Sequence, residues 1–291
     1  MSASPVLTQR RQLAHIVARE SAETLVGRAA GIRVDVIRRL IGPLAHQLAG
    51  RFVAYDRALG ESGLRDGSAW IIDDATGGLA AEGREHIPAH GPLLIVANHP
   101  GLSDAVAILA AIGREDAWIV AADYPFLHAL RLASRRFLFV SDDRSGRLST
   151  IRRIVMALRR GETVVLFPAG GILLAAVVFA ATRRFVRDAA VASLATWSRS
   201  IALFARLARG TLVVPTAIRG VVSRSAFDHP LARRRAPVKE RQRVATLLQL
   251  ALPAYRSHRV RITFGDPIIS AVTTDVHAAV VDAMDALLAS A

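Results

Sequence analysis

Apolar and polar positions in the first sixty residues alternate with the period of a helix. In residues 31–52, apolar side chains recur every three or four positions, a spacing that places them on one helical face. They are Ile37, Leu40, Ile41, Leu44 and Leu48. Pro43 interrupts this pattern and predicts a kink or a new helix start. We therefore expect residues 1–60 to form a basic helical N-terminal segment.

From about residue 68, short apolar runs alternate with longer helical patterns. The runs end in turn residues and are typical of buried strands. Their sequences are AWIIDD, PLLIVAN, AWIVAAD, RFLFVSD, TVVLFPAG, LVVPTAI and RVRITFGDPI. Helical patterns cover residues 105–112, 148–160 and 189–209, and another closes the chain. This alternation predicts an α/β domain over residues 61–291, with a central, mostly buried mixed sheet flanked by helices.

One apolar stretch is long enough to raise the question of a membrane span. Val164 to Thr182 is nineteen residues without a charge, and that length can cross a bilayer. Pro168, Gly170 and Gly171 would break a helix near its start. We therefore expect a buried strand, a turn and a short apolar helix. A transmembrane span and insertion into one leaflet remain alternatives.

Composition narrows the chemistry. The 291 residues include no cysteine, which excludes disulfides, thiolate metal sites and a cysteine acyl-enzyme. We expect no metal and no resident cofactor.

The charge of the chain indicates which classes of partner it binds. The formal net charge is +14, which favours anionic partners such as membranes, nucleic acid or phosphorylated substrates. Only 5% of residues are aromatic, which counts against a single-stranded nucleic-acid surface. Arg33, Arg38, Arg39 and Arg51 accompany the N-terminal apolar pattern. A basic amphipathic helix of this kind can lie on an anionic membrane. The alternative is a helix packed on its own domain with its arginines in water.

The segment NHPGLSD contains the strongest candidate for chemistry. His99 and Asp104 are separated by four residues, and the same spacing recurs at His277 and Asp282. Only the first pair follows an expected strand, and reactive groups of open α/β sheets gather just past the carboxyl ends of strands. Pro100 and Gly101 predict a turn. A carboxylate beside an imidazole fixes its tautomer and raises its basicity, which suits a general base.

This segment resembles the Asn-His-x4-Asp signature of the glycerolipid acyltransferase superfamily, of the lysophosphatidic acid type. Four further segments follow in that family's order over about residues 75–270. They are RFLFVSDDRSGRL with Arg144, VVLFPAGG with Phe167 and Pro168, LVVPTAIRG with Pro215, and the late strand VRITFGDPI. The resemblance implies a glycerolipid acyltransferase-like fold.

The resemblance also implies a reaction. These enzymes transfer a fatty acyl group from acyl-CoA or acyl carrier protein to a hydroxyl of a lipid acceptor. By resemblance, His99 is the base, Asp104 orients it, and no acyl-enzyme forms. Backbone N–H groups around Gly170 and Gly171 are candidates for holding the oxyanion. Asn98 is a further candidate for the vicinity of the oxyanion and the acyl donor.

Two features bear on the acceptor. Arg144 occupies the family's basic position and could bind a phosphate of the acceptor or of coenzyme A; alternatively, it is an exposed arginine beside Asp142 and Asp143. The third block departs from the family, because Ala169 stands where a glutamate is usual and no arginine follows soon after. Since those residues are associated with a glycerol-phosphate acceptor, a different lipid head group or lost activity is possible.

Two other functions compete. A serine esterase would use Ser103 in GLSDA, which approximates a nucleophile elbow, with an acid from Asp228 or Asp266 and a base from His258 or His277. A non-catalytic binder of anionic membranes or nucleic acid would use a basic cluster, whose members are Arg233, Arg234, Arg235, Lys239, Arg241 and Arg243. No nucleic-acid-binding signature accompanies that cluster. We expect a peripheral or monotopic acyltransferase on the cytoplasmic face of a membrane, with no nucleic-acid partner.

Overall fold

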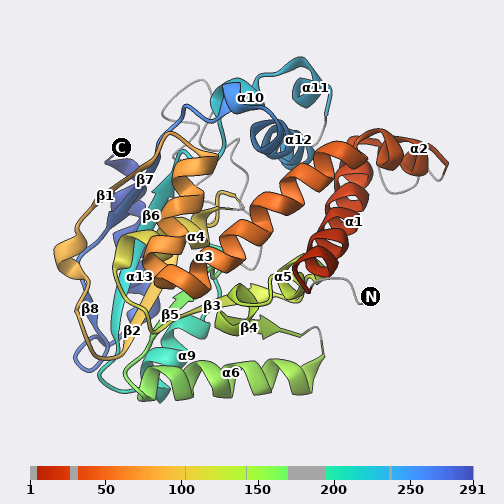
Figure 1. The fold of residues 1–291 in the computed structure, drawn as a ribbon. Helices are drawn as coiled ribbons and strands as arrows, with labels where there is room; N and C mark the ends of the chain where they lie inside the picture. The colour runs from red at the N-terminus through yellow and green to blue at the C-terminus, as the bar shows by residue number, and fades with distance from the viewer. Residues whose placement is uncertain are drawn as a thin grey trace.

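The computed structural model describes residues 5–26, 32–101, 103–141, 143–169, 194–235 and 238–290. It shows an eight-stranded mixed sheet with helices on both faces (Figure 1). The strands are β1 Leu79–Glu82, β2 Leu93–Ala97, β3 Ala117–Ala122, β4 Phe137–Val140, β5 Thr163–Leu166, β6 Leu212–Arg219, β7 Val260–Phe264 and β8 Ile268–Ile269.

The described helices run from one end of the chain to the other. They are α1 Pro5–Val26, α2 Ile32–Leu40, α3 Gly42–Ala75, α4 Asp104–Ile112, α5 Pro125–Ala129, α6 Arg144–Arg159, α9 Ser200–Leu207, α10 Arg224–Phe227, α11 Pro230–Arg233, α12 Val238–Ala251 and α13 Val276–Ala289. Short 3-10 helices lie at Arg84–His86, Ala133–Arg136 and Pro253–Tyr255. The predicted fold class, a mixed sheet flanked by helices with a helical N-terminal segment, is confirmed.

The order and direction of the strands determine which strand ends lie together. The order is β1-β7-β6-β2-β5-β3-β4, with β8 also paired to β6. The five strands from β6 to β4 run parallel, whereas β7 and β8 pair with β6 in the antiparallel sense. The carboxyl ends of β6, β2, β5, β3 and β4 therefore meet along one edge of the sheet.

Strand β2 lies at the centre and is buried along its whole length. Successive side chains of a strand point to opposite faces of the sheet. Leu93, Ile95 and Ala97 accordingly join the core under α1, α3 and α4. Leu94 and Val96 join the core under α6, α9 and α13. A strand buried on both faces explains why its sequence is a continuous apolar run.

Pro215 lies inside β6, where a residue without an N–H group normally breaks a ladder. The N and C=O of one strand residue face the same side, and the Pro215 carbonyl accepts from Gly265 N at 2.8 Å. On that side β7 pairs with residues 216–219 of β6 and β8 pairs with residues 212–213. The nitrogen of Pro215 therefore faces the break between two partner strands, where no ladder bond is required.

The N-terminal helices follow the predicted pattern. Helix α3 starts at Gly42 with Pro43 in its first turn, as the sequence indicates. The helix is interrupted at Gly63, whose φ is 85°, a conformation that glycine adopts without strain. The Glu115 carboxylate accepts from Leu64 N at 2.6 Å and from Arg65 N at 3.1 Å. An anion at this point satisfies the free N–H groups of the restarted helix.

Arg51 does not project into water. Its Nε donates to the Asp74 carboxylate at 2.6 Å, and its Nη1 donates to the Leu250 carbonyl at 3.1 Å. The guanidinium therefore joins α3 to the end of α12, as in the alternative in which this helix packs on its own domain.

Asp56 ties the N-terminal helices to the sheet domain. Its side chain is buried and accepts from Gln9 Nε2 at 2.7 Å. It also accepts from Leu132 N at 2.8 Å and Ala133 N at 2.9 Å. One carboxylate therefore joins α1, α3 and the loop before β4. The predicted boundary at residue 60 falls within α3, three residues before Gly63, and it stays a prediction.

We expect Asp56→Ala to lower the free energy of unfolding by roughly 2 to 4 kcal/mol, because it leaves buried N–H groups without an acceptor. Urea unfolding followed by circular dichroism measures this change. Asp66→Ala is the matched control, since Asp66 is exposed and its nearest cation, Arg65, is 4.0 Å away. Equal unfolding midpoints for the two variants would contradict the assignment.

One predicted strand is wrong. The run AWIIDD, residues 69–74, belongs to α3. Buried side chains of this part of α3 fall at Leu64, Ser68, Ile72 and Ala75, which is helical spacing. Trp70 is largely exposed whereas Ile72 is buried, although both would share one face of a strand. A short apolar run does not distinguish a strand from a buried helix. The first strand is instead β1.

The long apolar stretch begins as predicted. Residues 163–166 form β5, and Phe167 to Ala169 leave the strand in a turn. Its continuation, residues 170–182, lies outside the described residues. No helix in the described part of the chain combines the length and the apolar character needed to cross a bilayer.

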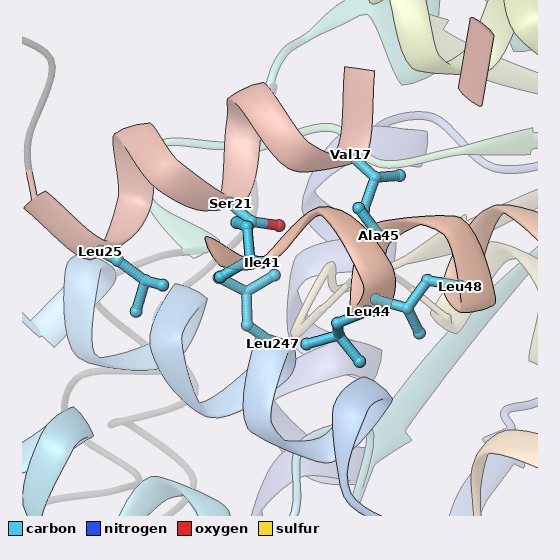
Figure 2. A pocket seen from close by; sticks show the side chains of 8 residues that line it. All are labelled: Val17, Ser21, Leu25, Ile41, Leu44, Ala45, Leu48 and Leu247. Carbon is cyan, nitrogen blue, oxygen red and sulfur yellow. The ribbon is translucent and has the colours of Figure 1, made fainter. Parts of the chain in front are cut away.

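Three helices meet around an apolar groove (Figure 2). Helix α1 contributes Val17, Ser21 and Leu25, the start of α3 contributes a second wall, and Leu247 of α12 closes the third side. The second wall consists of Ile41, Leu44, Ala45 and Leu48. Ile41, Leu44 and Leu48 of the predicted apolar stripe therefore pack toward α1 and α12, whereas Leu40 is exposed on α2.

Candidate active site

His99 lies at the carboxyl edge of the sheet, where β2 ends at Ala97 and only Asn98 separates it from the strand. Its Nδ1 is 2.7 Å from Oδ2 of Asp104, the first residue of α4. The His99 side chain is 22% exposed whereas that of Asp104 is 0% exposed. The carboxylate therefore holds one ring nitrogen in the interior and leaves Nε2 as the nitrogen available to a substrate.

Backbone donors complete the environment of the Asp104 carboxylate. Oδ2 also accepts from Gly101 N at 3.0 Å, and Oδ1 accepts from Ala105 N at 3.1 Å. Ser103 occupies the N-cap position of α4 but makes no capping bond through its side chain. The carboxylate therefore accepts from backbone N–H groups on both oxygens, at the N-terminus of α4. As the acceptor opposite Nδ1, it orients the ring and leaves Nε2 facing away from the interior.

Asn98 fastens the end of β2 to β6. Its Nδ2 donates to the Ile218 carbonyl at 2.9 Å, and its Oδ1 accepts from Ile218 N at 2.7 Å. The side chain is buried and thus continues the sheet ladder past the last backbone pair. The suggested role of Asn98 near the oxyanion or the acyl donor stays a prediction.

Phe167 sets the plane of the imidazole. Its ring stacks on that of His99 with centroids 4.4 Å apart and an interplanar angle of 26°. Phe167 follows β5, and Val96 of β2 pairs with Leu166 of β5, so adjacent parallel strands deliver the two rings together. Pro168 is buried, and its carbonyl accepts from Ser198 N at 3.1 Å. The two motif positions Phe167 and Pro168 therefore shape the site wall.

Gln242 supports the turn after His99 and was not found from the sequence. It is buried on α12, and its Nε2 donates to the Pro100 carbonyl at 2.5 Å. Gly101, in the same turn, packs so closely that a Cβ there would lie 2.6 Å from Cγ1 of Val221. The segment around the basic cluster forms α10, α11 and α12, and α12 helps to hold the turn after His99.

Arg144 begins α6, which follows β4 at the same edge of the sheet. Its side chain is exposed and makes no hydrogen bond or ion pair with the part of the chain that the structure describes. Asp143 does not pair with it, because its carboxylate caps α6 by accepting from Gly146 N at 2.8 Å. The Ser141 hydroxyl and that N–H group hold the pKa of Asp143 below its usual value. A phosphate ligand for Arg144 stays a prediction.

Several predicted positions cannot be placed. Gly170 and Gly171, the candidates for the oxyanion, lie outside the described residues, as does Asp142. Ala169, where the family usually has a glutamate, is half-buried at the end of the described segment. Within the described ranges, no group of three or more side chains of the metal-binding types lies close enough to hold an ion.

The structure does not assemble the serine triad. His258 bonds the Gln249 side chain at 3.1 Å and the Tyr255 carbonyl at 3.1 Å, and burial lowers its pKa. His277 lies 3.2 Å from the Trp197 carbonyl. The candidate acids are also engaged elsewhere, because Asp228 pairs with Arg241 at 2.9 Å and Asp266 pairs with His86 at 3.3 Å.

The basic cluster is partly neutralised by its own fold. Arg241 packs its guanidinium 4.0 Å from the centre of the Phe227 ring and pairs with Asp228. Arg233 also pairs with Asp228, at 3.3 Å, and Arg243 pairs with Glu240 at 2.7 Å. The cluster is therefore in large part a set of local ion pairs, which weakens the case for a nucleic-acid surface.

The chain is similar to known proteins over the region that holds this site. The family model described as Acyltransferase matches residues 78–219, a range that contains both His99 and Asp104. Among solved structures, the chain is similar to a 1-acyl-sn-glycerophosphate (LPA) acyltransferase, PlsC, from Thermotoga maritima. That similarity has 14% sequence identity and a TM-score of 0.45, and it covers 97% of this chain and 93% of the other. A comparison with curated proteins gave no match.

Proposed function

Because the chain carries an acyltransferase-family domain over residues 78–219, we propose that it transfers a fatty acyl group from a carrier thioester to a hydroxyl of a glycerolipid or lysophospholipid acceptor. The family assignment agrees with the predicted resemblance. The observation that supports the proposed mechanism is the pair of His99 and Asp104 at the carboxyl edge of the sheet, 2.7 Å apart.

The proposed reaction is a direct transfer. Nε2 of His99 takes the proton of the acceptor hydroxyl, and the oxygen attacks the thioester carbonyl. The tetrahedral intermediate collapses with cleavage of the C–S bond, and the carrier thiolate takes the proton back from His99. Asp104 holds Nδ1 protonated throughout and stabilises the imidazolium that forms between these steps. No residue of the chain becomes acylated.

The oxyanion of the intermediate needs donors that are already in position. Backbone N–H groups around Gly170 and Gly171 are our candidates, because these residues follow Phe167 and Pro168 closely along the chain and Phe167 stacks on His99. Arg144, exposed at the same sheet edge, is our candidate for a phosphate of the acceptor or of the donor. Ala169 offers no charge, so we expect an acceptor that differs from glycerol phosphate.

We also propose that the protein works at the cytoplasmic face of a membrane as a peripheral or monotopic enzyme. The support lies on α2, where Val36 and Leu40 are 52% and 71% exposed in a helix that also carries Arg38 and Arg39. Apolar side chains beside arginines suit the boundary of an anionic bilayer. Each arginine near the surface contributes about 1 kcal/mol.

The experiment that tests the function supplies purified protein with labelled acyl-CoA or acyl carrier protein and a panel of lysolipids with and without phosphate. We expect a labelled ester that appears only when donor and acceptor are both present, with one thiol released per ester. Thiol release without an acceptor, together with labelling by a fluorophosphonate probe, would favour the esterase. Absence of transfer from both donors would reject the proposal.

A further inference from the structure

The outer face of α6 combines positive charge with exposed apolar side chains. Five arginines and no acidic residue lie in the helix, and Arg160 follows it directly. Leu148 and Met156 are 48% and 57% exposed. With Arg152 between them, they follow each other at steps of four residues and therefore lie along one stripe of the helix. Exposed apolar groups among charges mark surfaces that bind a partner.

A hollow lies beside this stripe. Leu138 and Ala157 are buried, Trp118 and Met156 are apolar walls, and Arg153 and Arg160 stand at its rim. The Arg136 guanidinium lies 5.9 Å from the centre of the Trp118 ring. Tryptophan and arginine dominate the energetics of protein interfaces, and methionine adapts to varied partners. We call the hollow and the stripe together the α6 surface.

Trp118 and Arg160 at the hollow are already held by hydrogen bonds to one carboxylate. The Glu162 carboxylate accepts from the Trp118 indole at 2.8 Å and from Arg160 at 3.0 and 2.7 Å. Arg152 and Arg153 make no hydrogen bond or ion pair with the described part of the chain. The α6 surface therefore offers cations that an acidic partner can pair with, around a hollow that an apolar side chain of that partner can fill.

The α6 surface also reaches the active-site edge. Helix α6 starts at the carboxyl edge, just after β4, and its sixteen residues run back across the sheet for about 24 Å. Three strand spacings separate β4 from β2, which is about 14 Å. A protein bound along α6 is thus placed beside the edge that holds His99, and a flexible arm from it has a short span to cross.

A membrane is a poorer occupant of this surface than a protein. A hollow accepts a protruding side chain, whereas a planar layer of head groups cannot fill it. The protruding apolar residues that suit a bilayer lie on α2. Figure 1 shows α2 and α6 at opposite ends of the molecule, so a protein on α6 leaves α2 free.

We propose that the α6 surface docks an acyl carrier protein, and that this acidic, helical protein is the preferred acyl donor. The inference rests on the proposed function. Coenzyme A shares the thioester but has no protein surface to contact Arg152, Arg153 and Met156. Comparing the two donors therefore distinguishes an effect on docking from an effect on the chemical step.

The test compares the same acyl chain on the two donors, with the acceptor in uncharged detergent micelles to remove any bilayer contribution. In the variant Arg152→Glu/Arg153→Glu we expect the KM for acyl carrier protein to rise at least tenfold. We expect kcat and the KM for acyl-CoA to stay within twofold. Met156→Asp should act in the same direction. Arg234→Glu/Arg235→Glu, the same change of charge on the segment after α11, is the matched control and should change neither.

Other outcomes overturn the proposal. They are an equal effect on both donors, an unchanged KM for acyl carrier protein, or a wild-type protein that uses acyl-CoA alone. If the wild type transfers from neither donor, the proposed function fails, and surface plasmon resonance with acyl carrier protein then tests docking separately. Binding that is lost in the variant supports docking, and absence of binding rejects it. A variant that loses only its binding to anionic vesicles would assign the surface to a membrane.

Discussion

Replacing His99 with alanine is expected to lower kcat for acyl transfer by between about a hundredfold and ten-thousandfold, the range that a positioned general base supplies. Nε2 is the ring nitrogen left for the acceptor hydroxyl, because Nδ1 is held by Asp104. The measurement is single-turnover transfer of a labelled acyl chain with both substrates saturating. The fold should persist, because the His99 ring is partly exposed and contributes one stacking contact with Phe167.

The chain provides a matched control for this variant. His128 is also bonded to a carboxylate, with Nε2 2.5 Å from Asp123, and it also stacks on a phenylalanine, Phe139, with centroids 4.1 Å apart. It differs in being half exposed and in lying after β3 rather than β2. His128→Ala should therefore keep its activity within a few-fold. Activity that survives His99→Ala, or falls equally in both variants, would exclude His99 as the base.

Replacing Asp104 with asparagine is expected to reduce kcat by a similar factor, about a hundredfold to ten-thousandfold, while the KM values change little. An amide cannot replace both carboxylate oxygens, because one of its ends donates where Gly101 N, Ala105 N and His99 already donate. If its NH₂ group faces His99, it donates to Nδ1 and moves the ring proton to Nε2. His99 then has no free nitrogen at the position of the acceptor hydroxyl.

Comparing Asp104→Asn with Asp282→Asn distinguishes the effect of where the pair lies in the fold from the effect of its spacing along the sequence. Asp282 follows His277 at the same interval, but the His277 ring bonds the Trp197 carbonyl and Asp282 is exposed on α13. We expect Asp282→Asn to leave transfer unchanged. Thermal unfolding of each variant by circular dichroism controls for loss of fold. A stable Asp104→Asn protein with normal kcat would show that the carboxylate does not orient the base.

The local parts of the site are predictable from the sequence because they depend on neighbouring residues. A buried strand, a proline–glycine turn and a helix start place His99 and Asp104 together within six positions of the chain. The start of α3 around Pro43 and the end of β5 just before Phe167 also depend on neighbouring residues alone. The strand predicted for AWIIDD was wrong because six apolar and acidic residues fit both the period of a strand and the period of a helix. Only the buried positions along the whole of α3 distinguish the two.

The supports of the site are not local, and no pattern along the chain marks them. Asn98 meets Ile218, and Gln242 meets Pro100, across more than one hundred residues in each pair. Gln242 stands among arginines in a segment that resembles a solvated surface. Its burial appears only when α12 packs over the turn after His99. Sequence reasoning therefore found the candidate base and its acid, and it missed one of the residues that hold them.

By itself, the sequence of this protein determined the α/β class, the order of the segments that resemble an acyltransferase, and the candidate base and acid, because strand, turn and helix signals act over a few residues. Only the tertiary structure decided that Arg51 serves an internal contact, that α12 supports the turn after His99, and that Arg153 and Arg160 line an apolar hollow beside α6. These features arise from packing between distant segments, whose free energy depends on burial and partner geometry that a linear pattern does not contain.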